Sequence, residues 1–95
     1  MSAHTCHAVG CETTCAPKFL MCPRHWRMVP KVLQEAVWAT YRPGQERGGA
    51  LPSRNWFAAA RAAQVAVGDL EGRTDVPTGY RTTGAPYLAL LETTP

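Results

Sequence analysis

The sequence has no cysteine and no histidine beyond residue 25, so any soft metal ligands are confined to its first quarter. No apolar run approaches the ~20 residues that a membrane-spanning helix needs, and no apolar leader precedes the cysteines. Charged residues make up 18% of the 95 residues and hydrophobic residues 45%, a balance that excludes wholesale disorder. We therefore expect one small cytoplasmic domain with no membrane partner.

Catalytic signatures are also missing. The sequence contains no H-E-x-x-H motif and no glycine-rich phosphate loop. No Ser/His/acid set and no pair of carboxylates stands out as a candidate for nucleophilic or acid–base chemistry. We therefore expect a protein that is not an enzyme.

What the sequence does contain is a cluster of metal-binding residue types. In a reducing cytoplasm four cysteines are more often thiolate ligands than disulfides. Cys22 and His25 are separated by three positions, which places both donors on one face of a helical turn. Pro23 suits the first position of that turn, because its missing N–H would have no partner there anyway.

A second pair of donors lies upstream of this turn. Cys6 and Cys11 bracket a short loop in which Gly10 supplies the backbone freedom of a tight chelating turn. The spacing C-x4-C-x10-C-x2-H predicts a site for one structural zinc ion. Its expected ligands are Cys6, Cys11, Cys22 and His25. Cys15 or His7 could replace one of them, although a buried structural role suits Cys15 better.

The rest of the chain predicts a small zinc-stapled α+β fold. Residues 12–15 and 18–21 read as two short strands, which would complete a treble-clef-like knuckle and hairpin within a zinc module of about residues 4–28. Apolar periodicity predicts an antiparallel pair of helices over about 29–42 and 53–71, with Ser53 as an N-cap. Residues 1–72 would form this single zinc-binding domain. Residues 73–95 would be a tail, either mobile or docked through the apolar residues 87–91.

Several short motifs resemble a group of small zinc-finger-like proteins encoded by bacteriophages and prophages. The similarity covers roughly residues 5–67 and includes Cys-His-Ala-Val-Gly-Cys (6–11), Met-Cys-Pro-Arg-His-Trp (21–26) and Tyr-Arg-Pro-Gly-Gln (41–45). It implies the same four ligands and a bacterial host cell, and it implies no biochemical role.

Charge and aromatic residues suggest where partners bind. Residues 17–47 carry six Lys and Arg against two Glu, a net charge of +4, whereas residues 48–95 are neutral. The main hypothesis is an adaptor or inhibitor that binds a host or phage protein, because aromatic residues dominate interface hot spots. The alternative is a nucleic-acid-binding accessory protein or transcription regulator, and a homodimer is a third arrangement. The candidate partner-binding residues are Arg24, Arg27, Lys31, Trp38, Arg42 and Arg47.

Overall fold

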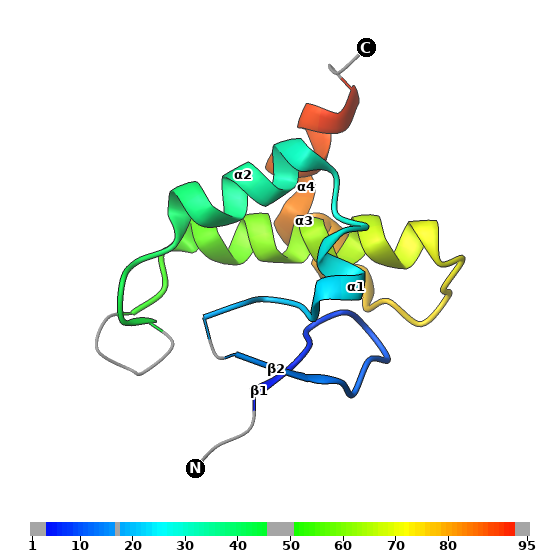
Figure 1. Ribbon diagram of the computed structural model, residues 1–95. Coiled ribbons are helices and arrows are strands. Elements are labelled where there is room, and N and C mark those ends of the chain that lie inside the picture. The colour runs from blue at the N-terminus through cyan, green and yellow to red at the C-terminus, as the bar shows by residue number, and fades with distance from the viewer. Residues whose placement is uncertain (1–3, 17, 46–50, 93–95) are drawn as a thin grey trace.

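The computed structural model describes residues 4–16, 18–45 and 51–92, which form two short strands and four helices (Figure 1). Their order along the chain is β1 (His4–Thr5), β2 (Thr14–Cys15), α1 (Pro23–Trp26), α2 (Lys31–Thr40), α3 (Arg54–Leu70) and α4 (Thr78–Glu92). The fold is therefore a small α+β arrangement, as the sequence predicts.

The two strands pair differently from the prediction. β1 and β2 are antiparallel, with His4 opposite Cys15 and Thr5 opposite Thr14. The prediction that residues 18–21 supply the second strand is wrong. Residues 18 and 19 belong to a turn, in which the Phe19 N–H donates to the Ala16 carbonyl at 2.9 Å. The next residue, Leu20, accepts a hydrogen bond on its carbonyl from the His7 N–H at 3.0 Å. The chain after the turn thus passes beside the Cys6 loop, where it delivers Cys22.

α1 is the helical turn expected at Cys22 and His25, and α2 lies within the helix expected over about residues 29–42. α1 starts at Pro23 in the first helical position, as predicted. Pro30 precedes α2, and the α2 side chain of Gln34 donates to the Trp26 carbonyl at 2.8 Å, which ties the two helices together.

Helix α3 begins and ends where the sequence signals indicate. The Ser53 hydroxyl accepts the Trp56 N–H at 3.0 Å, so Ser53 is an N-cap. Beyond the helix Gly72 adopts a φ of +69°, which only glycine adopts readily. α2 and α3 lie side by side and antiparallel (Figure 1), as expected from the small residues that line α3.

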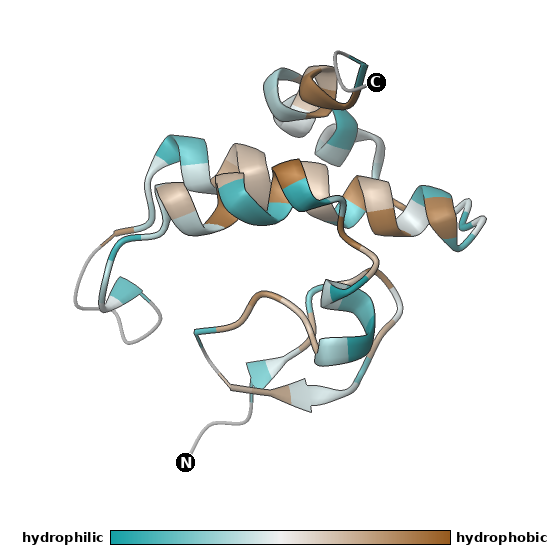
Figure 2. Cartoon of the chain, turned by 45° about the horizontal axis from the view of Figure 1, so that its top comes forward, coloured by the Kyte–Doolittle hydropathy of each residue, from teal (hydrophilic) through white to brown (hydrophobic). Residues whose placement is uncertain are grey.

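Residues 78–92 of the expected tail form helix α4, which packs mainly against α3. The sequence did not predict this helix, because Gly79, Gly84 and Pro86 all disfavour helix. Gly84 permits the contact, since a Cβ there would lie 2.6 Å from the Ala62 backbone nitrogen. Figure 2 shows the α2–α3 pair between the N-terminal module and α4.

A single apolar core joins the N-terminal module to the helices. Cys6, Met21 and Cys22 belong to the same buried cluster as Leu33 of α2 and Val67 of α3. Cys6 and Cys22 therefore pack against the core that the helices form.

Within the described ranges no helix combines the length and apolarity that crossing a bilayer requires.

Candidate metal centre

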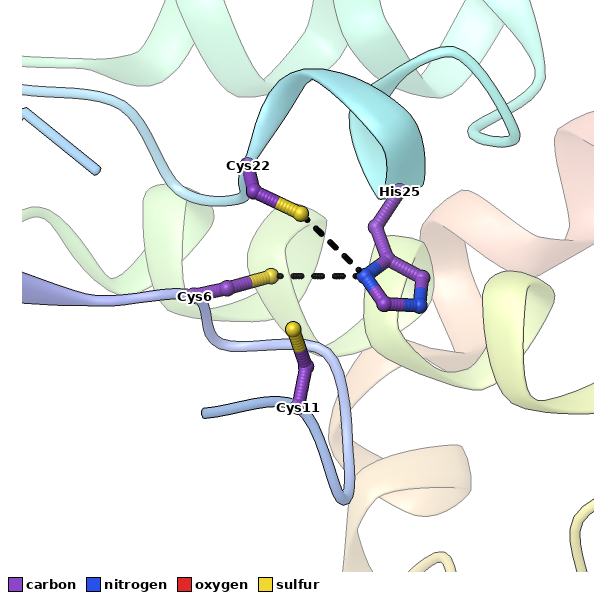
Figure 3. Close-up of side chains that lie close together, drawn as sticks. All are labelled: Cys6, Cys11, Cys22 and His25. Carbon is purple, nitrogen blue, oxygen red and sulfur yellow. Dashed lines mark hydrogen bonds between the residues drawn. The ribbon is translucent and has the colours of Figure 1, made fainter. Parts of the chain in front are cut away.

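Four side chains from three parts of the chain point toward a common centre (Figure 3). The Sγ atoms of Cys6, Cys11 and Cys22 and a ring nitrogen of His25 all lie within 4.8 Å of one another. The His25 Nδ1 is 3.4 Å from the Cys22 Sγ and 3.7 Å from the Cys6 Sγ. The structure thus brings together all four ligands predicted from the sequence.

These separations match the edges of a tetrahedral coordination site. With metal–sulfur bonds of ~2.3 Å and metal–nitrogen bonds of ~2.0–2.1 Å, the sulfur-to-nitrogen edge of a tetrahedron is about 3.5 Å. The two measured Sγ–Nδ1 distances, 3.4 and 3.7 Å, lie on either side of this value. Cys6, Cys22 and His25 are buried and Cys11 is partly exposed. The cluster is therefore consistent with a closed metal site that has four protein ligands.

The loop between Cys6 and Cys11 has the backbone geometry that such a site needs. The Cys11 N–H donates to the Ala8 carbonyl at 3.0 Å, which closes a turn, and Gly10 has a φ of +83°. The Cys6 N–H donates to the Thr13 carbonyl at 2.8 Å, which fixes the start of the loop. Gly10 therefore has the role that the sequence indicates.

The three thiols have different proton affinities. Burial raises the pKa of the Cys6 thiol to about 12. Burial also acts to raise the pKa of Cys22, but hydrogen bonds from His25, Cys6 and Cys11 outweigh it and bring that pKa down to about 6. In Cys11 the hydrogen bonds from Thr13 and Cys6 outweigh burial, and the pKa is lowered. Cys22 is thus a thiolate near neutral pH, which suits it to bind a cation first.

The carboxylate of Glu71 orients His25, and no motif in the sequence points to this residue. The His25 Nε2 lies 3.0 Å from the Glu71 Oε2, just beyond the end of α3. When Nδ1 faces the sulfurs, Nε2 carries the proton and donates it to Glu71, the usual support of a metal-binding histidine. Nε2 is also 3.2 Å from the Arg24 Nη2, and in this tautomer that contact joins two donors and is not a hydrogen bond.

Residues 71–77, which connect α3 to α4, cover the site from the side on which Glu71 lies. The Arg73 guanidinium packs over Gly10, where it occupies the space that a Cβ would need. Asp75 holds that guanidinium through a bidentate pair, with its Oδ1 2.8 Å from Nε and its Oδ2 2.6 Å from Nη2. Glu71 and Arg73 therefore attach the connector to both ligand pairs.

The alternative ligands considered from the sequence lie outside the cluster. Cys15 is partly exposed, and its thiol lies 3.8 Å from the Phe19 carbonyl. The His7 ring stacks on the His4 ring with centroids 4.9 Å apart, and burial lowers the pKa of His7. The His7 carbonyl accepts from the buried Gln64 side chain of α3. These contacts link the N-terminal loop to the helices without involving the four clustered side chains.

The candidate partner-binding residues are spread over two sides of the module. Arg24, Arg27 and Lys31 are exposed, and the Arg42 guanidinium donates to the Leu51 carbonyl at 2.9 Å. Arg47 lies outside the described residues. Trp38 remains 42% exposed although its ring meets Phe19 edge-on with centroids 6.1 Å apart. Trp38 thus packs on the N-terminal module and still faces solvent.

Beside Trp38 lies a hollow that we call the aromatic groove, two adjoining cavities between residues 18–26, α2 and α3. The first has a volume of about 210 Å³. The second, of about 150 Å³, shares Lys18, Phe19 and Tyr41 with it and adds His4 and His7. All three tryptophans of the chain line the first cavity. The aromatic side chains of that cavity are Phe19, Trp26, Trp38, Tyr41 and Trp56.

Comparison of the chain with models of protein families, with curated proteins and with solved structures gives no match. Function must therefore be inferred from the site and the surface.

Proposed function

We propose that this protein is a non-enzymatic, zinc-stapled adaptor or inhibitor that binds a segment of another protein in the aromatic groove. The observation that carries the proposal is the aromatic wall of the first cavity beside the exposed Trp38. Rigid aromatic side chains around a preformed hollow are typical of interface hot spots. A cavity of roughly 150 Å³ holds a benzene-sized molecule, so 210 Å³ admits one large apolar side chain.

Zinc is the metal that suits the candidate centre best. Three thiols and an imidazole are a donor set of structural zinc sites, and here the four ligand atoms lie within 4.8 Å of one another. Four protein ligands leave no coordination position for a substrate, which supports a structural and not a catalytic ion. The resulting arrangement is treble-clef-like, with a chelating knuckle at residues 6–11 and the second ligand pair at the start of α1. Elemental analysis of purified protein tests this identity directly.

The resemblance of residues 5–67 to phage and prophage proteins leads us to propose that the protein acts in the cytoplasm of a bacterial host, on a host or phage protein.

Affinity capture from host lysate tests the proposal when three proteins are compared. Wild type and Leu70→Ala are expected to retain the same partner, and Trp38→Ala is expected to lose it. Leu70 is 64% exposed and lines neither cavity, so it controls for the loss of an exposed apolar side chain. A partner that binds all three proteins equally would show that the groove is not the binding surface.

Nucleic-acid binding is the second candidate, and the charge of one segment favours it. Residues 18–45 contain five Lys and Arg against a single Glu. Exposed Arg27 and Lys31 could contact phosphates, which would give an affinity that falls steeply with added salt. Fluorescence anisotropy with duplex DNA and hairpin RNA tests this, and no binding at ~50 mM salt would eliminate it.

A further inference from the structure

The aromatic groove carries one positive charge, at Lys18. Lys18 lines both cavities, and its Nζ lies 5.4 Å from the centroid of the Phe19 ring, which also lines both. No carboxylate contributes to either wall among the residues that the structure describes. The groove is therefore suited to an occupant with negative charge beside its apolar part.

The two cavities also differ in polarity. The first is walled almost entirely by aromatic and aliphatic side chains, with Lys18 as its one charged residue. The second adds His4, whose Nε2 lies 2.9 Å from the Phe19 carbonyl, together with the His7 ring and the amide of Gln45. The His7 ring and the Gln45 NH₂ group can each donate a hydrogen bond to a carboxylate or a backbone carbonyl. Alternate side chains of an extended peptide point to the same face and lie ~6.6 Å apart, so two side chains of one segment can enter both cavities.

A cationic occupant is disfavoured even though the wall is aromatic. Cages that bind methylated ammonium groups rely on the negative faces of aromatic rings. Here the Lys18 ammonium already lies over the Phe19 ring and would repel a second cation. Charge complementarity at an interface sets which partners are accepted, because like charges placed together cost several kcal/mol.

We propose that the groove recognises an acidic segment of a partner protein in which one aromatic or leucine side chain fills the first cavity and a neighbouring Asp or Glu pairs with Lys18. The inference rests on the proposed function and specifies the chemistry of its partner. The apolar anchor supplies most of the affinity, whereas the carboxylate supplies selectivity.

The test uses the full-length zinc-loaded chain and a displayed library of short random peptides as the probe. Selected peptides are expected to share an aromatic residue or leucine within a few positions of Asp or Glu. Because all three tryptophans line the first cavity, intrinsic tryptophan fluorescence reports binding there directly. Affinities for one selected peptide are then measured for wild type and four variants.

The variants separate the apolar and the charged contribution. We expect Trp38→Ala and Lys18→Glu each to weaken binding about tenfold or more. The matched controls Leu70→Ala and Arg54→Glu should stay within about twofold of wild type, because both residues are exposed and lie outside the groove. Neutralising the acidic residue of the peptide should weaken binding to wild type less than Lys18→Glu does, and it should improve binding to the Lys18→Glu variant because it removes the repulsion between two carboxylates.

Each result decides one of the two proposals. Selected peptides that depend on Trp38 but carry no acidic residue, or that bind the Arg54→Glu variant as poorly as the Lys18→Glu variant, overturn the acidic partner and leave the protein-binding function standing. Peptides that ignore Trp38→Ala, or the failure to select any, overturn both. Displacement of the peptide by DNA, or a dimer that Trp38→Ala dissolves in light scattering, identifies a different occupant and overturns the inference.

Discussion

At the scale of single residues, the His25 ring connects the metal centre to the helical body. Its Nδ1 faces the sulfurs and its Nε2 faces Glu71 at 3.0 Å. Glu71 follows α3, 46 residues beyond His25, so the ring is held by a part of the chain that belongs to the helices. Such a carboxylate fixes the tautomer and the orientation of a metal-binding histidine.

Replacing Glu71 should therefore weaken metal binding without removing a ligand. We expect Glu71→Ala to lower the affinity for zinc about 10–100-fold and Glu71→Gln to lower it less, because the amide oxygen still accepts the Nε2 proton. Competition with a chromogenic chelator measures the affinity. Glu92→Ala removes an exposed carboxylate at the end of α4 and is the control. An unchanged affinity in Glu71→Ala would contradict this role.

The thiol pKa values predict how metal binding depends on pH. Near pH 7.5 Cys6, with its pKa raised to about 12, still holds a proton, whereas Cys22, with a pKa of about 6, has lost its own. The metal-bound site holds fewer protons than the metal-free site, so the affinity must rise with pH and fall as pH falls. We expect about one to two protons to be released per metal ion at that pH. Calorimetry in buffers of different ionisation enthalpy measures this number, and zero release would contradict the predicted protonation of Cys6.

The ligand set could be predicted from the sequence because it depends on local spacing alone. Cys22 and His25 needed one helical turn, and the loop from Cys6 to Cys11 needed one glycine. Glu71 could not be predicted, because its position depends on how the end of α3 packs against the module. Cys15 was ambiguous for a similar reason. Only its place opposite His4 in the strand pair directs it away from the cluster.

At the scale of elements, the contact between α3 and α4 depends on a glycine. Substitution of glycine by alanine within a helix normally stabilises it by about 0.5–1 kcal/mol. At Gly84 the added Cβ would lie 2.6 Å from the Ala62 backbone nitrogen, and backbone cannot move aside as a flexible side chain can. We therefore expect Gly84→Ala to lower the free energy of unfolding by about 1–3 kcal/mol.

Gly79 provides the matched control in the same helix. An added Cβ at Gly79 meets no atom within 4 Å, so Gly79→Ala should be neutral or stabilising by up to about 1 kcal/mol. Urea unfolding of the zinc-loaded protein, followed by circular dichroism, measures both variants. If Gly84→Ala stabilised the protein as much as Gly79→Ala, α4 would not pack on α3 in this way.

The elements differ in how far the sequence determines them. α2 and α3 carry clear apolar periodicity, and Ser53 and Gly72 mark the limits of α3, so local signals suffice. α4 contains Pro86, which cannot donate a backbone hydrogen bond, and its helical state comes from burial against α3. The predicted strand partner of Thr14–Cys15 was wrong because a strand of two residues carries almost no sequence pattern. Its actual partner, His4–Thr5, is brought opposite it by the loop that contains Cys6 and Cys11.

At the scale of the whole molecule, the metal centre and the aromatic groove are built from the same stretch of chain. Residues 18–26 contribute Phe19, Met21 and Trp26 to the groove and Cys22 and His25 to the metal site. Structural zinc supplies ~10–16 kcal/mol of apparent binding free energy, as much as the ~5–15 kcal/mol that stabilises a typical domain. We therefore expect the position of one wall of the groove to depend on a metal bound at this cluster.

Removal of the metal should abolish the groove together with the fold of the N-terminal module. We expect a strong chelator to expose the three tryptophans, with a red shift of their emission, and to eliminate binding of a groove-selected peptide. Far-UV circular dichroism should lose helical signal as well, because Met21 and Cys22 share one apolar core with α2 and α3. Added Zn²⁺ should restore all three signals, and Cys15→Ala should respond as wild type does because its thiol lies outside the ligand cluster. Elemental analysis must show that the chelator has removed the metal. If tryptophan emission and peptide binding are then unchanged, the helices alone shape the groove.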